Sequence, residues 1–179
     1  MQEVFLSVIG VNTVLFLAAQ DSLTDFVDLL LRFGADVNQK VGGMAPLHIA
    51  TQEGHVRVVR ALLAAPNVDV NIELGDEVED GRSATPLYLA AQEALMEIVK
   101  LFVADGRAFP KRSNLSTREE FLETLQLYAE EAENEGNKEL SEDYKAVLEI
   151  FDSYQPSGKE VRGAAAVGLG ASSCGRSLH

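Results

Sequence analysis

The sequence predicts an all-α solenoid in which short antiparallel helix pairs stack side by side. Three observations lead to this fold class. The segment from Ala45 to Asn71 reads APLHIATQEGHVRVVRALLAAPNVDVN, and related segments run from Thr13 to Asn38 and from Thr85 to Pro110. Self-similarity at a period of roughly 20–50 residues is typical of repeat arrays. Within each copy, apolar residues follow a helical period, and turn residues separate two short runs.

The middle copy shows why each repeat should fold as two helices. Leu47 and Ile49 belong to a short first helix, and Pro46 suits its first turn, where a backbone N–H is not needed. Gly54 separates this helix from a second one. The apolar residues of the second helix recur at helical spacing: Val56, Val58, Val59, Leu62 and Leu63. Such pairs bury both sides only when neighbours stack on them, and about three copies form a minimal array.

Residues 112–155 predict a further helix pair that lacks the repeat motif. Ser116 with Glu119 fits a capping box, and Gly136 separates two apolar stripes. We interpret this acidic pair as a cap on the array at residues 1–111. Its last apolar run is also faintly similar to the second helix of a tetratricopeptide repeat. Residues 156–179 are rich in Gly, Ala and Ser, which predicts a disordered tail.

The recurring motifs resemble the ankyrin repeat, whose pattern runs TPLHLAA, GH, an apolar VVxLLL helix and GADVN. This resemblance implies three repeats at about residues 12–40, 41–72 and 82–111, with hairpin fingers between them. The second connection is lengthened by an insertion at residues 73–81, which should project as an acidic finger. The resemblance also implies that His48 and His55 tie turns together through hydrogen bonds.

Composition and charge exclude several classes of function. The chain has 179 residues, of which 46% are hydrophobic, and its net charge is -13. Residues 73–81 contain five acids and no base, and residues 112–155 contain twelve acids against four bases. Such a surface repels nucleic acid and anionic membranes. The apolar stretch Val4–Ala19 is too short to span a bilayer and lacks a basic leader. With a single cysteine, Cys174, we expect an intracellular protein in the cytoplasm or nucleus.

No residue pattern predicts catalysis, a cofactor or a metal. His48 and His55 are seven residues apart and lack a third ligand, and Cys174 has no neighbouring base. Phosphate-binding loops, CxxC pairs and HExxH are absent from the sequence. The acids of the finger do not follow EF-hand spacing, so a calcium site is a lesser alternative. We therefore expect that the protein is not an enzyme, although an enzyme is kept as a further alternative.

The ankyrin resemblance implies a protein-binding module or scaffold. In this family the concave face is built from finger tips and from polar positions just before GH. The corresponding residues, with the acids of the finger, are Gln20, Asp21, Met44, Gln52, Glu53, Asp76, Glu77, Glu79, Asp80, Gln92 and Glu93, together with Val41 and Ala84 on the fingers. We expect a monomer that binds a basic protein surface there. Alternatively, these groups are merely solvated, or the chain is a fragment or regulatory arm of a larger ankyrin-repeat protein without its own partner.

Asn38 and Asn71 suggest a modification site. Each follows a leucine eight residues upstream, Leu30 and Leu63, in a DVN context. This arrangement is similar to the site used by asparaginyl hydroxylases that act on ankyrin repeats. Asparagine also suits turn geometry, which explains both residues without modification.

Overall fold

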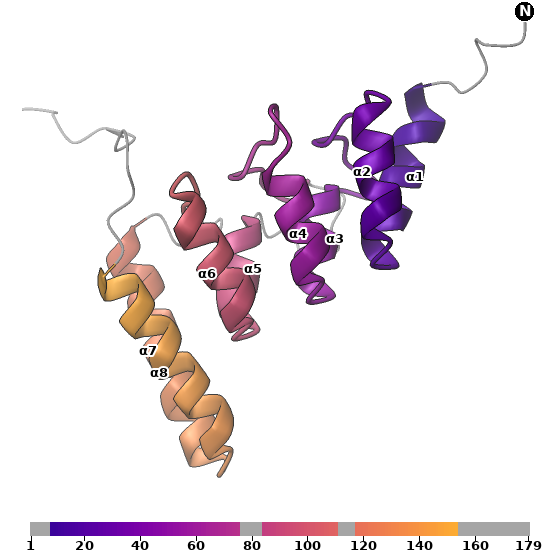
Figure 1. The fold of residues 1–179 in the computed structure, drawn as a ribbon. Coiled ribbons are helices and arrows are strands. Elements are labelled where there is room, and N and C mark those ends of the chain that lie inside the picture. Colours follow the sequence, from indigo (N-terminus) through magenta and orange to yellow (C-terminus); the bar gives the residue numbers. More distant parts are fainter. Residues whose placement is uncertain (1–7, 76–83, 111–116, 154–179) are drawn as a thin grey trace, which may run out of the picture.

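The computed structural model describes residues 8–75, 84–110 and 117–153, whose helices form a row of stacked pairs (Figure 1). The first helices of the pairs are α1 (Val8–Gln20), α3 (Pro46–Gln52) and α5 (Pro86–Gln92). The second helices are α2 (Thr24–Arg32), α4 (Val56–Leu63) and α6 (Met96–Asp105). First helices pack on first helices and second helices on second helices along the row. The described part of the chain has no named strand, so the predicted all-α solenoid is confirmed.

The three pairs share one turn geometry between their helices. A single residue adopts positive φ in each turn: Ser22 at 61°, Gly54 at 71° and Ala94 at 50°. This conformation lets the following backbone N–H reach back into the first helix, as His55 N–H does to the carbonyl of Ala50 at 2.8 Å. Only glycine adopts such a conformation without steric cost, so two of the three turns are strained.

Asparagine side chains tie successive pairs together. Asn38 donates its amide to the carbonyl of Asn67 at 2.7 Å, and its side-chain oxygen accepts from the N–H of Asp69 at 2.8 Å. Asn71 makes the same two kinds of bond to the third repeat, at 2.9 and 2.6 Å. Each amide therefore satisfies a carbonyl and an N–H in the turn of the next repeat, which accounts for both asparagines structurally.

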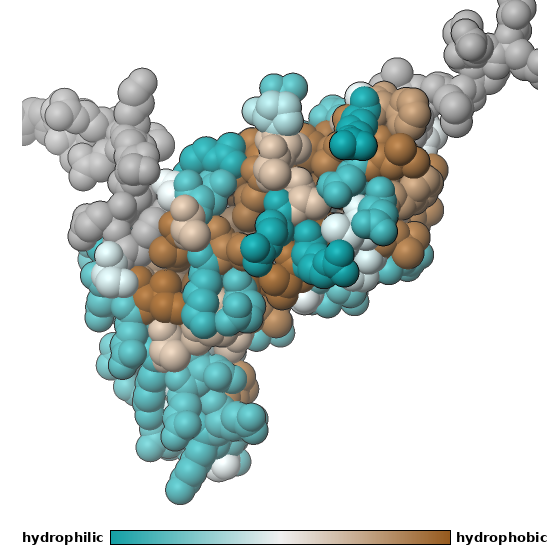
Figure 2. Space-filling view, viewed as in Figure 1, coloured by the Kyte–Doolittle hydropathy of each residue, from teal (hydrophilic) through white to brown (hydrophobic). Residues whose placement is uncertain are grey.

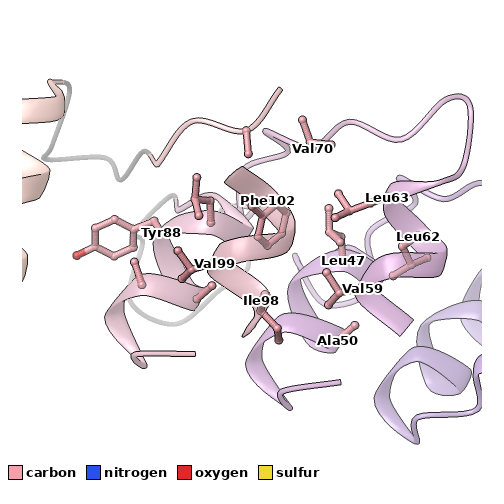
Figure 3. Packing of buried hydrophobic residues seen from close by; sticks show 14 of the residues in the cluster. Leu47, Ala50, Val59, Leu62, Leu63, Val70, Tyr88, Ile98, Val99 and Phe102 are labelled. Atoms are coloured by element: carbon pink, nitrogen blue, oxygen red, sulfur yellow. The ribbon is translucent and has the colours of Figure 1, made fainter. Parts of the chain in front are cut away.

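The apolar core runs continuously through the stack. Figure 3 shows Leu47 and Val59 of the second pair and Ile98 and Phe102 of the third pair in one layer. Small residues such as Ala50, which is fully buried, permit the close approach of neighbouring helices. Stacking therefore buries side chains that an isolated pair would expose.

A longer hairpin, α7 (Arg118–Asn134) and α8 (Lys138–Ser153), packs on the last repeat pair (Figure 1). Thr117 caps α7: its hydroxyl accepts from the N–H of Glu120 at 3.2 Å, and the Glu120 carboxylate accepts from the N–H of Thr117 at 3.1 Å. The capping box is thus one residue later than the predicted Ser116–Glu119 pair, and Ser116 lies outside the described residues. Gly136, at φ 81°, follows the end of α7, as expected for the break between the two helices.

A polar row at the helix turns as a candidate protein-binding surface

Three exposed carboxylates lie at the ends of the first helices. Asp21, Glu53 and Glu93 each follow the last residue of α1, α3 or α5, directly before the turn to the second helix. We call these three residues the acidic row. Because the pairs stack in the same orientation, the turns line one edge of the array (Figure 1). The structure therefore brings together acids that are about 32 to 40 residues apart in the sequence.

Two of the three glutamines beside the acidic row contact other parts of the fold through their backbone carbonyls. Gln20 and Gln52 are exposed, whereas Gln92 is half-buried. The carbonyl of Gln20 lies 2.8 Å from Nε2 of His55 in the next pair. The carbonyl of Gln92 accepts a hydrogen bond of 2.7 Å from the hydroxyl of Tyr144 on α8. Tyr144 of the hairpin thus contacts the last carbonyl of α5, just as His55 of the second repeat contacts the last carbonyl of α1.

The acidic row continues onto the hairpin. Burial raises the pKa of the Tyr144 hydroxyl, and the nearby carboxylates of Glu93 and Glu131 raise this pKa further. The two carboxylates therefore act on the same hydroxyl, although Glu93 follows α5 and Glu131 belongs to α7. Glu131 is exposed and was not among the residues predicted from the sequence. No repeat motif marks its position, and only the packing of the hairpin places it beside the row.

The first finger lies at the opposite edge from the acidic row. Val41 and Met44 exchange two backbone hydrogen bonds, of 2.8 and 3.1 Å, around Gly42 and Gly43, whose φ values are 56° and 80°. This is the glycine-dependent two-residue hairpin turn. Met44 is half-buried just before α3, and Gln52 ends that helix, so the helix separates them by roughly 10 Å. The finger and the acidic row therefore lie at opposite ends of α3.

The four acids assigned to the second finger lie outside the described residues: Asp76, Glu77, Glu79 and Asp80. The base of that finger is described. Leu74 N–H bonds the carbonyl of Ala84 at 3.1 Å, and Gly75 N–H bonds the carbonyl of Gly43 at 2.7 Å. Ala84 is 3% exposed, so its side chain is part of the core and not of a partner surface, contrary to its assignment from the sequence.

His48 is a buried structural residue. Its Nδ1 accepts from the N–H of Ala45 at 3.2 Å, and its Nε2 lies 3.2 Å from the carbonyl of Ala84, which favours the tautomer with the proton on Nε2. Burial lowers the pKa of His48 to about 4, so the ring is neutral at pH 7. Within the described ranges, no three His, Cys, Asp or Glu side chains gather closely enough to hold a metal ion. No helix in those ranges is both long and apolar enough to span a bilayer.

The stacked pairs, their shared turns and the asparagine ties define the chain as a helical-repeat solenoid protein. A family model described as "Ankyrin repeats (3 copies)" matches residues 4–74. Residues 4–74 thus match the ankyrin repeats that the motifs predicted. Ankyrin repeats are protein-binding modules, and this chain contains such a module.

Several curated proteins are similar over part of their length. Alpha-latroinsectotoxin-Lt1a of Latrodectus tredecimguttatus is 33% identical over 95 residues, which are 53% of this chain and 6% of the toxin. Rabankyrin-5 of Mus musculus is 35% identical over 80 residues, 44% of this chain and 6% of that protein. I-Kappa-B like protein H1 of Microplitis demolitor bracovirus is 32% identical over 81 residues, 44% of this chain and 38% of the viral protein. The chain thus spans only a small part of its first relatives, and the match concerns the repeats.

Proposed function

We propose that the chain binds a basic segment of another protein through the acidic row. The observation that supports this most directly is the repetition of one exposed carboxylate, Asp21, Glu53 and Glu93, on three successive pairs. The backbone N–H of each residue bonds a carbonyl of the helix that it follows, but within the described ranges none of the three side-chain carboxylates forms a hydrogen bond or an ion pair. Unpaired carboxylates at regular spacing attract cationic side chains at little desolvation cost, because they remain solvated until contact.

The spacing of the acidic row suggests a form for the partner. Packed helices lie roughly 8–10 Å apart, so successive carboxylates recur at about that interval. A peptide in the polyproline II conformation advances about 3.1 Å per residue with three residues per turn, so every third side chain recurs on one side at roughly 9 Å. We therefore expect a segment in this extended conformation with Lys or Arg at about every third position. The acids of the second finger, which lie outside the described residues, would then provide a separate contact.

Charge reversal of the acidic row tests the proposal. A variant with Asp21→Lys, Glu53→Lys and Glu93→Lys should capture far less basic protein from a cell extract than the unmodified chain does. The matched control reverses three exposed acids of the hairpin, Glu119→Lys, Glu123→Lys and Glu142→Lys, and so makes the same change in net charge elsewhere. Equal capture by the two variants would show that the acidic row has no special role.

The salt dependence of binding gives a second measurement. The affinity for a captured partner should fall as salt rises, because exposed ion pairs are screened over about 8–10 Å at 0.1–0.15 M salt. A separate variant, reversed at Asp76, Glu77, Glu79 and Asp80, measures the contribution of the finger. Affinity that is independent of salt would mean that apolar contacts, and not charge, drive the binding.

Hydroxylation of Asn38 and Asn71 remains a prediction. Both amides are engaged in hydrogen bonds to the next turn, so an enzyme would need local opening of the array to reach them. Intact-mass and peptide mass spectrometry of protein isolated from cells would detect an added oxygen at either residue, and an unchanged mass at both would exclude the modification there.

A further inference from the structure

The first end of the array exposes a cluster of large apolar side chains. Val14 and Leu17 on α1 are 37% and 49% exposed, and Phe33, directly after α2, is 78% exposed. Phe26 and Leu29 on α2 are also exposed. We call these five residues the N-terminal face, and Figure 2 shows apolar surface over this end of the molecule. In the described ranges, the large exposed apolar residues outside the face are Leu23, directly before α2, and Leu127 on α7.

The N-terminal face corresponds to the side by which the other pairs stack. Phe26 stands at the position of Val58 in the second repeat, and Leu17 stands at the position of Ile49. Val58 is fully buried and Ile49 is 6% exposed, because the preceding pair covers them. The side chains of α1 and α2 are therefore arranged for packing, but nothing in the described part of the chain covers them.

The N-terminal face carries an aromatic ring that the equivalent internal surfaces lack. Phe33 stands where the second repeat has Ala65 and the third has Asp105, whereas Leu29 corresponds to Ala61 and to Leu101. Those alanines face α2 and line, with its residues, a groove of about 890 Å³ between α2 and α4. A repeat stacked in the ordinary register would have to accommodate an aromatic ring where the internal contact has a methyl group. This size difference favours an occupant other than a repeat in that register.

We propose that two copies of the chain associate through their N-terminal faces. The other end of a copy cannot serve as the complement, because α7 and α8 already cover the last repeat pair: the ring of Phe121 lies 5.8 Å from that of Tyr88. Contact between identical faces produces a closed two-fold dimer, whereas head-to-tail contact would need an open second end. The proposal does not rest on the acidic row, which lies at the helix turns.

The distribution of charge favours the same arrangement. The described part of the hairpin, residues 117–153, contains twelve acids against three bases. Pairing at the N-terminal faces places the two acidic hairpins at opposite ends of the dimer, where their repulsion is weakest. Both acids of α2 line the groove toward α4; Asp28 therefore lies away from the apolar face, whereas Asp25 also lines a smaller hollow with Phe26.

The size of the N-terminal face sets the expected affinity. Side chains of this kind, exposed to this degree, offer on the order of 500 Å² of apolar surface in each copy. A pair would then bury on the order of 1,000 Å² in total, which is near the lower limit for a specific interface. We therefore expect a dissociation constant in the micromolar range and a reversible monomer–dimer equilibrium.

Sedimentation-velocity analysis of the full chain, from about 1 to about 200 µM, tests this inference. The weight-average mass should rise from monomer to dimer over this range. Phe26→Glu with Phe33→Glu should weaken association at least tenfold, and Leu29→Glu is a second variant in case the double variant folds poorly. Leu127→Glu, which places the same charge on an exposed leucine of α7, should leave association unchanged. Circular dichroism establishes that each variant is folded.

Three outcomes would overturn the proposal. A chain that stays monomeric across the whole range would agree with the monomer expected from the sequence and would leave the face open to a different occupant, such as a further repeat. Assemblies that grow beyond a dimer would indicate a heterologous contact. A dimer that Leu127→Glu abolishes, or that the variants of the face leave intact, would place the interface elsewhere. The triple reversal of the acidic row should not affect the dimer, so this proposal and the proposed function fail separately.

Discussion

The two ends of the array differ in how their apolar sides are covered. At the C-terminal end, Tyr88 of the last repeat pair is 1% exposed because Phe121 of α7 packs against it, and Phe151 of α8 packs in turn against Phe121 at 5.1 Å. At the first end, Leu17 and Phe26 are exposed, although the equivalent residues of the second repeat are buried. Among the described residues, one end is thus covered by a hairpin without the repeat motif, and no helix packs over the other end.

This difference shows that closing a repeat array does not require another repeat. The hairpin uses aromatic contacts and one hydrogen bond, from Tyr144 to the carbonyl of Gln92, in place of the repeat signature. Its outer surface is rich in acids, so it ends the stack with a solvated face. The following predictions test how far stability depends on this closed end and how the open end responds, in order of decreasing expected effect.

Removing the central ring of the closed end should have the largest effect. Phe121→Ala is expected to lower the free energy of unfolding by about 3–5 kcal/mol, because the ring is 1% exposed and contacts both Tyr88 and Phe151. Urea titration followed by circular dichroism measures this loss. Leu127→Ala, on the solvent side of the same helix, should change stability by less than about 0.5 kcal/mol. If Phe121→Ala lowered the free energy of unfolding as little as Leu127→Ala does, the hairpin would contribute little to the stability of the array.

Acid should destabilise the array at His48, which contacts the carbonyl of Ala84 before the third repeat. The folded pKa of about 4 lies below the ordinary value of 6.5, so the unfolded chain binds the proton more readily. The stability contribution is therefore complete above pH 6.5 and is lost as the pH falls toward 4, by on the order of 3 kcal/mol in total. Unfolding titrations at pH 7, 5.5 and 4.5 measure the loss. His48→Gln, which does not titrate, should show a much flatter profile over the same range, and an unchanged slope would assign the pH dependence to other groups.

Relief of backbone strain in the turns should have the smallest effect and should distinguish the ends. Ala94→Gly is expected to stabilise the protein by about 0.5–1 kcal/mol, because Ala94 has a φ of 50°. Ser22→Gly relieves a similar strain at φ 61° in the open-ended pair. If that pair opens before the rest of the chain, its global effect will be smaller than that of Ala94→Gly. Gly54→Ala is the reciprocal control and should destabilise, since its Cβ would meet no neighbour and only the backbone would be strained.

Much of the fold was predictable because short-range patterns specify it. Pro46 and Pro86 start first helices as expected, Gly54 has the positive φ of the turn, and His48 and His55 bond backbone carbonyls of neighbouring repeats. These residues act within a few positions of one another or at a fixed repeat spacing, so a single sequence reveals them.

Less of the candidate site was predictable. Asp21, Glu53 and Glu93 stand at equivalent places after three first helices, as their repeated position indicated, and Met44 lies on the first finger as assigned, but Ala84 is buried. Whether a side chain before a helix is exposed depends on how tightly the adjacent finger pairs with its neighbours. The contacts of that finger join residues about thirty positions apart, and no local pattern encodes them.

The sequence by itself determined the repeat: the helix pairs, the turns between them, the asparagine ties and the acidic character of the two departures from the motif. Local propensity and hydrophobic period specify these features, and the same pattern recurs in each repeat. Only the tertiary structure decided which apolar sides are covered. Tyr144 reaches the carbonyl of Gln92, and Glu131 acts on the same hydroxyl as Glu93, because the hairpin packs on the last pair, whereas Phe33 is exposed because no helix of the described residues packs on it. Burial depends on neighbours that are distant in the chain, and a repeat motif does not specify where its own array begins or ends.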